Sequence, residues 1–258
     1  MSARARNRLR EIGEMTSLVR TRISAADPRE RDGAGYRLLV RFAGWAQPGY
    51  VATKSGKSWF ADAGFFDHYD RLMPHDRRRS AERKYLLRSL LGLADGLPGD
   101  TAECGVYNGA SSWFICRHFA GSGKTHHGFD SFQGLPEPSA IDGGYWRRGD
   151  AAATEDQART TLAGFDVELH AGWIPERFAD VADRSFCFVN VDVDLYAPTR
   201  DSIEFFYPRM VPGGVMLFDD YGSGFQSPGT AKAIDDFMAD KPESVIASPT
   251  AQAFIVKR

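Results

Sequence analysis

The segment Phe188-Val189-Asn190-Val191-Asp192-Val193-Asp194 is an apolar run that ends in two carboxylates. Such a run is typical of a buried strand, on which side chains two residues apart point to the same face. Asp192 and Asp194 are therefore expected to be neighbours at the carboxyl end of this strand. A second apolar run, 214–218, ends in Asp219 and Asp220. Because like charges gathered there are costly to bury, the pattern predicts a divalent cation between the two strand ends.

Strand patterns alternate with helix patterns from about residue 99 to the end of the chain. The expected strands are 101–106, 125–129, 167–170, 186–191, 215–218, 244–247 and 253–256. Helices are expected from Asn108, from the capping box at Thr154, from Pro198 and from Thr230. This alternation predicts an α/β fold with a Rossmann-like, doubly wound sheet, mostly parallel with an antiparallel C-terminal strand.

Acidic residues follow several of the expected strands. They are Glu103, Asp130, Asp192, Asp194, Asp219 and Asp220. In open α/β sheets, ligands bind outside the carboxyl ends of the strands. The acids are therefore expected to share one site.

Composition narrows the class of protein. The chain has 258 residues, of which 43% are hydrophobic and 26% charged, and its net charge is -2. The absence of a basic balance argues against a nucleic-acid binder. No apolar run is long enough to cross a bilayer, and the arginine-rich start lacks the apolar stretch of a signal peptide, so we expect a cytoplasmic protein with no membrane partner. The three cysteines form no C-x-x-C pair and are expected to be buried thiols.

Residues 1–85 differ from residues 86–258. They show no strand–helix alternation, and an aromatic-rich stretch runs from Phe42 to Tyr69. We expect a helical lid that contributes to an acceptor pocket, with the aromatics either in its core or against a ligand. The run from Asp76 to Lys84 predicts an amphipathic helix with a solvated basic face; a nucleic-acid contact is the alternative.

The turn after the first strand carries information about the cofactor. Glu103-Cys104-Gly105-Val106-Tyr107-Asn108-Gly109 has the form G-x-x-x-G, which argues against a nicotinamide or flavin dinucleotide. Glu103 is suited to accept hydrogen bonds from an ammonium group, and Asp130 from the hydroxyls of a ribose. Gly172 and Trp173 are suited to cover an adenine. S-adenosylmethionine carries all three groups; a solvated Asp130 and a core Trp173 are the alternatives.

The chain resembles the macrocin/novobiocin-type O-methyltransferases over about residues 80–258. The resemblance rests on five motifs in order: Pro98-Gly99-Asp100-Thr101-Ala102-Glu103-Cys104-Gly105-Val106, Phe129-Asp130-Ser131-Phe132-Gln133-Gly134-Leu135-Pro136, His170-Ala171-Gly172-Trp173, Val191-Asp192-Val193-Asp194-Leu195-Tyr196 and Phe218-Asp219-Asp220-Tyr221. It implies a magnesium- and S-adenosylmethionine-dependent enzyme that methylates a hydroxyl, on a sugar or a phenol, of a small-molecule natural product. A homodimer is the oligomer that the resemblance implies.

The resemblance also implies residue roles. Asp192, Asp219 and Asp220 are expected to hold Mg²⁺, and Asp194 to act as the general base. The expected cofactor contacts are Glu103, Gly105, Val106, Tyr107, Ser111, Asp130, Ser131, Gln133, Gly172 and Trp173. Tyr145 and Trp146, in the long loop after Asp130, and Tyr221 are expected to contact the acceptor.

Two other functions remain open from the sequence. A metal-dependent hydrolase would use the aspartates but would leave Glu103, Asp130 and Trp173 without a role. A non-catalytic nucleotide-binding module would leave Asp194 without one. His126 and His127, at the start of a strand, are expected to be structural. No Ser-His-Asp or Cys-His order supports covalent catalysis.

Overall fold

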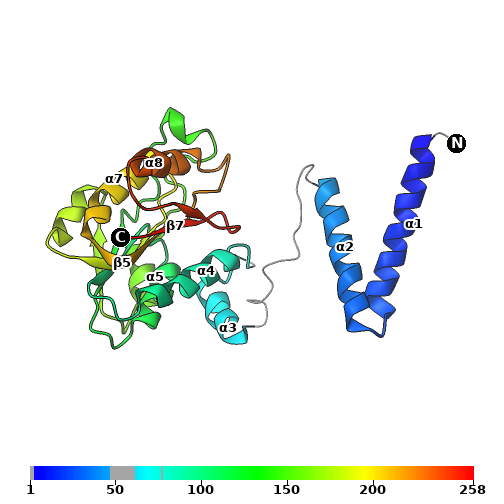
Figure 1. Ribbon diagram of the computed structural model, residues 1–258, viewed down its shortest axis with the longest axis horizontal. Coiled ribbons are helices and arrows are strands. Elements are labelled where there is room, and N and C mark those ends of the chain that lie inside the picture. Colours follow the sequence, from blue (N-terminus) through cyan, green and yellow to red (C-terminus); the bar gives the residue numbers. More distant parts are fainter. Residues whose placement is uncertain (1–2, 47–61, 77) are drawn as a thin grey trace. The chain divides into compact units, whose positions relative to one another are not determined.

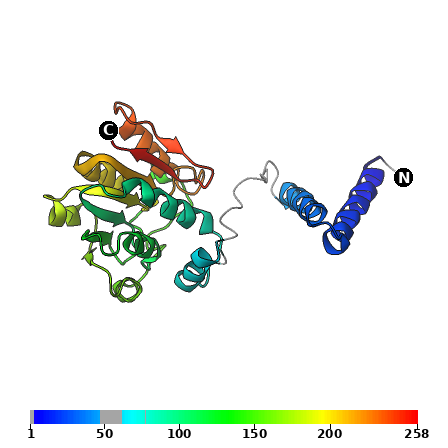
Figure 2. The ribbon, with the colours of Figure 1, turned by 60° about the horizontal axis from the view of Figure 1, so that its bottom comes forward.

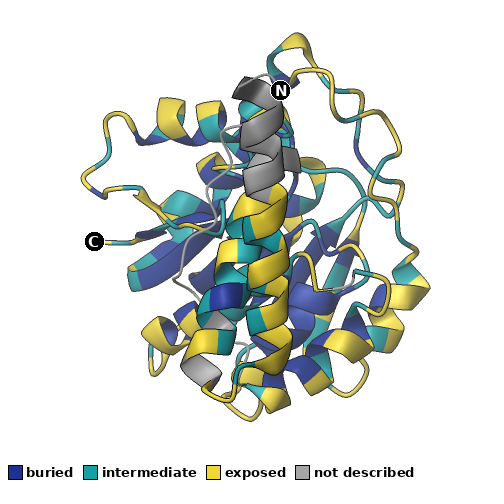
Figure 3. Ribbon diagram, turned by 90° about the vertical axis from the view of Figure 1, so that its right-hand side faces the viewer, coloured by how far each residue is buried: buried dark blue, intermediate teal, exposed yellow. Residues whose placement is uncertain are grey.

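The computed structural model describes residues 3–46, 62–76 and 78–258. The chain divides into two compact units, Met1–Ala61 and Asp62–Arg258. In the first unit, helices α1 (Ala3–Ser24) and α2 (Pro28–Ala46) lie side by side (Figure 1). Most of their described residues are exposed, whereas Ala34 is buried (Figure 3). Tyr50, Trp59 and Phe60, which belong to the aromatic-rich stretch from Phe42 to Tyr69, lie outside the described residues.

A seven-stranded sheet forms the second unit, in the order β3-β2-β1-β4-β5-β7-β6. The strands are β1 (Asp100–Cys104), β2 (His126–Asp130), β3 (Val167–Ala171), β4 (Phe186–Val191), β5 (Met210–Phe218), β6 (Ile246–Ala247) and β7 (Ala253–Val256). Strands β1 to β5 are parallel, whereas β7 runs antiparallel to β5 and to β6. The predicted sheet, with its antiparallel C-terminal strand, is confirmed.

Helices cover both faces of this sheet. They are α3 (Ala63–Leu72), α4 (Ala81–Leu91), α5 (Ala110–His118), α6 (Glu155–Thr161), α7 (Tyr196–Phe206) and α8 (Pro228–Met238). Short 3-10 turns cover Gly92–Ala94, Ala140–Asp142, Glu176–Val181 and Tyr207–Arg209. Helices α4 and α5 pack together, as do α7 and α8, and the two pairs lie on opposite sides of the sheet (Figures 1 and 2).

Helices begin at or within two residues of the positions that the capping signals predict. The capping box predicted at Thr154 is present. Helix α5 is capped by Gly109 rather than Asn108; the Asn108 side chain instead accepts a hydrogen bond from the amide of Ala110 (3.2 Å). Helix α7 begins at Tyr196, two residues before the expected Pro198.

The core is aromatic and aliphatic on both faces of the sheet. Its fully buried rings include Phe129, Phe186, Phe206 and Phe218. The three cysteines are free and buried, as predicted. Among the described residues, none of the helices combines the length and the apolar character that a membrane crossing requires.

Helices α3 and α4 belong to the unit that carries the sheet. Phe65 on α3 is fully buried, and its ring lies 5.2 Å from Tyr85 and 5.5 Å from Phe114, measured between centroids. Burial of such large rings ties both helices to α5. The second unit, which begins at Asp62, thus includes α3 and α4 as well as the sheet.

Candidate active site

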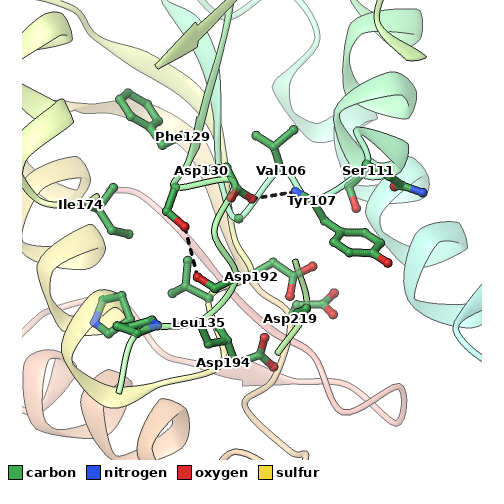
Figure 4. Close-up of a pocket in the computed structure, with 18 of the residues that line it drawn as sticks. Val106, Tyr107, Ser111, Phe129, Asp130, Leu135, Ile174, Asp192, Asp194 and Asp219 are labelled. Atoms are coloured by element: carbon green, nitrogen blue, oxygen red, sulfur yellow. Dashed lines mark hydrogen bonds between the residues drawn. The ribbon is translucent and has the colours of Figure 1, made fainter. Parts of the chain in front are cut away.

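A cavity of about 730 Å³ opens at the carboxyl ends of β1, β2 and β4. Figure 4 shows Asp130 on one side of it and Asp192, Asp194 and Asp219 together on the other. The sequence-predicted site residues that line it are Gly105, Val106, Tyr107, Ser111, Asp130, Ser131, Trp146, Gly172, Trp173, Asp192, Asp194 and Asp219. The structure thus brings the expected cofactor residues and most of the aspartates into one space.

Gly105 allows the ends of β1 and β4 to approach one another. Its φ of +89° lies in the left-handed region, and a Cβ placed there would lie 1.8 Å from the carbonyl oxygen of Asp192. Only glycine tolerates both conditions. The amide of Asp192 in turn donates to the carbonyl of Cys104 (2.8 Å). Backbone geometry therefore places Asp192 directly beside the turn that follows β1.

Asp130 holds the turn after β1 in place. Its Oδ2 accepts from the amide of Tyr107 (2.8 Å) and its Oδ1 from the amide of Phe132 (2.7 Å). Burial raises the pKa of Asp130 above its usual value. Each carboxylate oxygen can accept a second hydrogen bond, so the side chain retains capacity for the hydroxyls of a ligand.

The aspartates form an acidic cluster in which Asp219 and Asp220 are buried and Asp192 and Asp194 are half-buried. One carboxylate oxygen from each of Asp192, Asp194 and Asp220 lies within 4.8 Å of the others. Burial, followed by the neighbouring carboxylates, raises the pKa of Asp192 and of Asp194 well above the usual range. Asp194 also has a φ of +60°, a conformation that non-glycine residues adopt at a cost and that is frequent at functional sites.

Asp219 has a different environment from the other three. Its Oδ2 accepts from Nη1 of Arg83 (2.8 Å) and its Oδ1 from Nε2 of Gln252 (2.6 Å). Burial raises the pKa of Asp219, but the charges of Lys84 and Arg83 outweigh it and hold this pKa below its usual value. Both of its oxygens therefore already have protein partners.

Two basic residues of α4 neutralise the acidic cluster. Lys84 is 8% exposed, and its Nζ lies 3.6 Å from Oδ2 of Asp192. Arg83 also contacts Oδ1 of Asp220 (3.1 Å). The prediction of a solvated basic face is wrong for this pair, because α4 turns Lys84 inward. The sequence carries a signal for this orientation, since Lys84 lies three residues before the buried Leu87.

Glu103 lies behind the cavity wall. Its Oε1 accepts from Nδ2 of Asn190 (2.7 Å), and its Oε2 accepts from the hydroxyl of Ser112. Burial raises the pKa of this carboxyl to about 7. The Glu103 side chain is fully buried, and its contacts are with Asn190 and Ser112 rather than with the cavity.

Other predicted residues lie outside the cavity lining. Gln133 is exposed, and the hydroxyl of Tyr221 donates to Asp235 on α8 (2.9 Å). Tyr145 is 45% exposed and packs against Trp146 and against Phe225, a residue that sequence reasoning missed.

The long loop 131–153 is tied to the helices beside the cavity. Buried Asp142 accepts from the amides of Tyr196 (2.6 Å) and Ser139 (2.8 Å). Nε1 of Trp146 donates to Ser227, the residue before α8 (3.0 Å). These contacts set the indole of Trp146 in the cavity wall.

Comparison with known protein families identifies the group. The model of the macrocin O-methyltransferase family matches residues 77–250, which contain the whole cavity lining apart from Met73. The chain belongs to this family.

Individual relatives of this family member share about a third of its residues or fewer over the aligned part. A 32% identical relative from Streptomyces olivaceus is an 8-demethyl-8-(2,3-dimethoxy-alpha-L-rhamnosyl)-tetracenomycin-C 4'-O-methyltransferase; 144 residues align, 50% of this chain and 55% of that protein. The demethyldecarbamoylnovobiocin O-methyltransferase of Streptomyces niveus is 26% identical over 164 residues, 57% of this chain and 61% of the relative. The chain therefore spans little more than half the length of these curated relatives.

Solved structures agree on the fold. The O-methyltransferase NovP has a TM-score of 0.56 and 25% identity, over 68% of this chain and 79% of the other. A calicheamicin methyltransferase has a TM-score of 0.60 and 17% identity, over 92% and 96% of the two chains.

Proposed function

We propose that this family member is an S-adenosylmethionine-dependent O-methyltransferase that acts on a sugar or phenolic hydroxyl of a small-molecule natural product. The observation that carries the proposal is that Asp130, Gly172, Trp173 and three of the aspartates, Asp192, Asp194 and Asp219, line one cavity. A hydrolase would not need Asp130 and the Gly172–Trp173 turn, and a binding module would not need the acidic cluster. The tetracenomycin and novobiocin relatives support the acceptor class.

The half of the cavity formed by β1, β2 and β3 suits the cofactor. S-adenosylmethionine supplies an electrophilic methyl group. Asp130 has free acceptor capacity for ribose hydroxyls, and Trp173 offers a flat apolar surface for adenine. Gly105, Val106, Tyr107, Ser111 and Ser131 line the remaining wall, with Gln133 at its exposed edge. Glu103 supports this wall from behind through Asn190 and Ser112.

The acidic cluster suits Mg²⁺. All of its donors are carboxylate oxygens, the hard ligands that this ion prefers, and several converge within 4.8 Å. The proposed ligands are Asp192 and Asp220, which belong to this converging group, and Asp219, whose Oδ2 would exchange its contact with Arg83 for the ion. When bound, Mg²⁺ lowers the pKa of an acceptor hydroxyl. Lys84 and Arg83 form ion pairs with these proposed ligands and so offset part of their negative charge.

Asp194 is the proposed general base. It lies in the cavity wall among the proposed ligands, where it can accept the proton of the acceptor hydroxyl. Positioning of that hydroxyl against the cofactor methyl supplies much of the remaining rate acceleration. Trp146 in the wall and Tyr145 beside it are proposed to contact the acceptor scaffold, as is Tyr221, which directly follows the proposed ligand Asp220.

Calorimetry with S-adenosylhomocysteine, with and without Mg²⁺, tests the proposal. We expect this product of the cofactor to bind the full chain. No binding would remove the methyltransferase proposal, whereas binding without acceptor turnover or a metal effect would favour the binding module. Incubation with hydroxylated natural products and S-adenosylmethionine, read out as a mass gain of one methyl group, identifies the acceptor.

We further propose a homodimer. Ile23, Leu39 and Phe42 on α1 and α2 are more than half exposed, and apolar surface of this kind is frequent at protein interfaces. Light scattering should give about twice the chain mass of 28.6 kDa. A mass of one chain across the tested concentrations would contradict this proposal.

A further inference from the structure

A second cluster of ionisable side chains lies on the sheet at β2 and β3. It consists of His127, Glu168 and His170. His127 is in register with Glu168, and Phe129 is in register with His170. Because residues two apart share a face of a strand, all of these side chains project from one face of the sheet. The two histidines are buried, whereas the Glu168 side chain is 56% exposed and leaves a route from solvent.

The separations within this cluster match those between ligands of one metal ion. Nδ1 of His127 lies 3.2 Å from Nε2 of His170 and 3.5 Å from Oε2 of Glu168. The third separation, from Nε2 of His170 to Oε2 of Glu168, is 4.0 Å. In a tetrahedral zinc site, metal–ligand bonds of about 2.0–2.1 Å place the ligand atoms roughly 3.4 Å apart.

Neutral histidines cannot satisfy these contacts by themselves. Nδ1 of His170 lies 3.0 Å from Oδ2 of Asp180, so it must carry a proton, and Nε2 is then an acceptor. His127 must therefore donate from Nδ1, which leaves its Nε2 without a proton. That atom is buried, has no hydrogen-bond partner and lies 3.5 Å from a carboxylate oxygen of Asp100. A buried lone pair facing a carboxylate is unfavourable.

A cation between the three side chains removes this conflict. Nδ1 of His127 and Nε2 of His170 would both direct lone pairs at the ion. The outer nitrogens would then both carry protons, directed at Asp100 and Asp180. Carboxylates behind metal-binding histidines are a recurrent feature of protein metal sites. An additional proton on His170 would also satisfy the four nitrogens, and the experiment must distinguish it from a metal.

We propose that His127, Glu168 and His170 form a binding site for a divalent transition-metal ion of the Zn²⁺ type, separate from the acidic cluster. Two imidazoles and one carboxylate are typical zinc ligands, whereas Mg²⁺ prefers oxygen donors. The ion would tie the edge strand β3 to β2. His170 is two residues before Gly172 and stacks on Phe129, which also lines the cavity (centroids 4.6 Å apart). The site would thus brace the strand that carries the proposed adenine turn.

Zinc titration of the untagged full-length chain tests this site. Calorimetry with Zn²⁺ in excess Mg²⁺ isolates it from the acidic cluster. Glu168→Gln removes a ligand at an exposed position and should not prevent folding. Asp180→Asn removes a partner behind a ligand. Glu176→Gln, at an exposed glutamate, and Asp220→Asn, in the acidic cluster, are the matched controls.

We expect one equivalent of zinc in the wild-type chain and in both controls. Asp180→Asn should bind about 10–100-fold more weakly, and Glu168→Gln at least as weakly. Bound Co²⁺ should show the visible absorption of a tetrahedral site in the wild-type chain but not in Glu168→Gln. No zinc uptake by the wild-type chain, or equal affinity in Glu168→Gln, would overturn the proposal and leave a shared proton as the explanation.

Discussion

The carboxyl ends of β4 and β5 and the face shared by β2 and β3 both concentrate ionisable groups, but they balance charge differently. At the strand ends, carboxylates converge and basic side chains from α4 compensate them. Between β2 and β3, two imidazoles face one another with carboxylates around them. The first arrangement provides hard oxygen donors in a large cavity, and the second provides nitrogen donors in the packed sheet. The two proposed metal sites on this sheet therefore differ in ligand type, with oxygen donors at the strand ends and mainly nitrogen donors between β2 and β3.

The largest effect is expected from Asp194→Asn, which tests whether chemistry is confined to the strand ends. Loss of a general base should lower turnover of the identified acceptor by about 10²–10⁴-fold. Single-turnover rates measure this effect, and S-adenosylhomocysteine binding in the presence of Mg²⁺ is the control that should not change. Full turnover with metal bound would show that Asp194 is not the base.

Lys84→Met tests how the strand-end charges are balanced. Removal of one partner from a buried ion pair leaves Asp192 uncompensated and should lower the free energy of unfolding by about 3–5 kcal/mol. Urea denaturation measures this loss, and added Mg²⁺ should recover part of it. Arg88→Met, on the same helix, breaks a more exposed pair with Asp62 and should cost only about 1 kcal/mol. An equal loss in both variants would contradict the proposed compensation.

Gly105→Ala tests the backbone contact that assembles the strand-end cluster. The left-handed φ costs about 1–2 kcal/mol for alanine, and the clash with the Asp192 carbonyl adds about 1–3 kcal/mol. Gly121→Ala is the matched control, because its φ is +77° but no atom lies within 4 Å of the added Cβ. Thermal unfolding should therefore separate the two variants, with Gly105→Ala the less stable.

The smallest effect is expected from Glu103→Gln, which probes the buried carboxyl behind the cavity. Its folded pKa of about 7, above the ordinary value of 4.5, means that the folded chain holds a proton that the unfolded chain lacks between these pH values. The stability contributed by Glu103 is therefore present below about pH 4.5 and is lost as pH rises through 7, by up to about 3 kcal/mol.

His126 opposes this trend in the wild-type chain. Burial lowers the pKa of His126 from 6.5 to about 3, so its contribution to stability is lost as pH falls. The measured quantity is therefore the difference in free energy of unfolding between wild type and Glu103→Gln at pH 5 and pH 7.5. Wild type should lose stability relative to the variant as pH rises; a constant difference would show that Glu103 is ionised in the folded chain throughout.

Local sequence patterns were enough for most of the fold. Apolar runs such as 186–191 located the strands, and the Thr154 capping box located a helix start, because both signals depend only on neighbouring residues. Asp130, Asp192, Asp194 and Asp219 line one cavity as expected, since parallel strands end at one edge of the sheet, whereas Glu103 is fully buried within β1.

The partners of those acids could not be predicted in this way. Arg83 lies 136 positions from Asp219, and Gln252 lies 33 positions from it, so no local pattern links them. The helical spacing between Lys84 and Leu87 indicates that Lys84 points inward. The run of arginines around it instead favours the interpretation of a solvated face. The family motifs likewise do not show that Glu103 contacts Asn190.

The sequence by itself determined the order of strands and helices, the family and the acidic character of the cavity, because periodicity and motif spacing are properties of the chain. Only the tertiary structure decided which aspartate pairs with Arg83, which three carboxylates converge and that His127 meets His170 across two strands. Those arrangements depend on distances between residues that are far apart in sequence, and packing alone sets these distances.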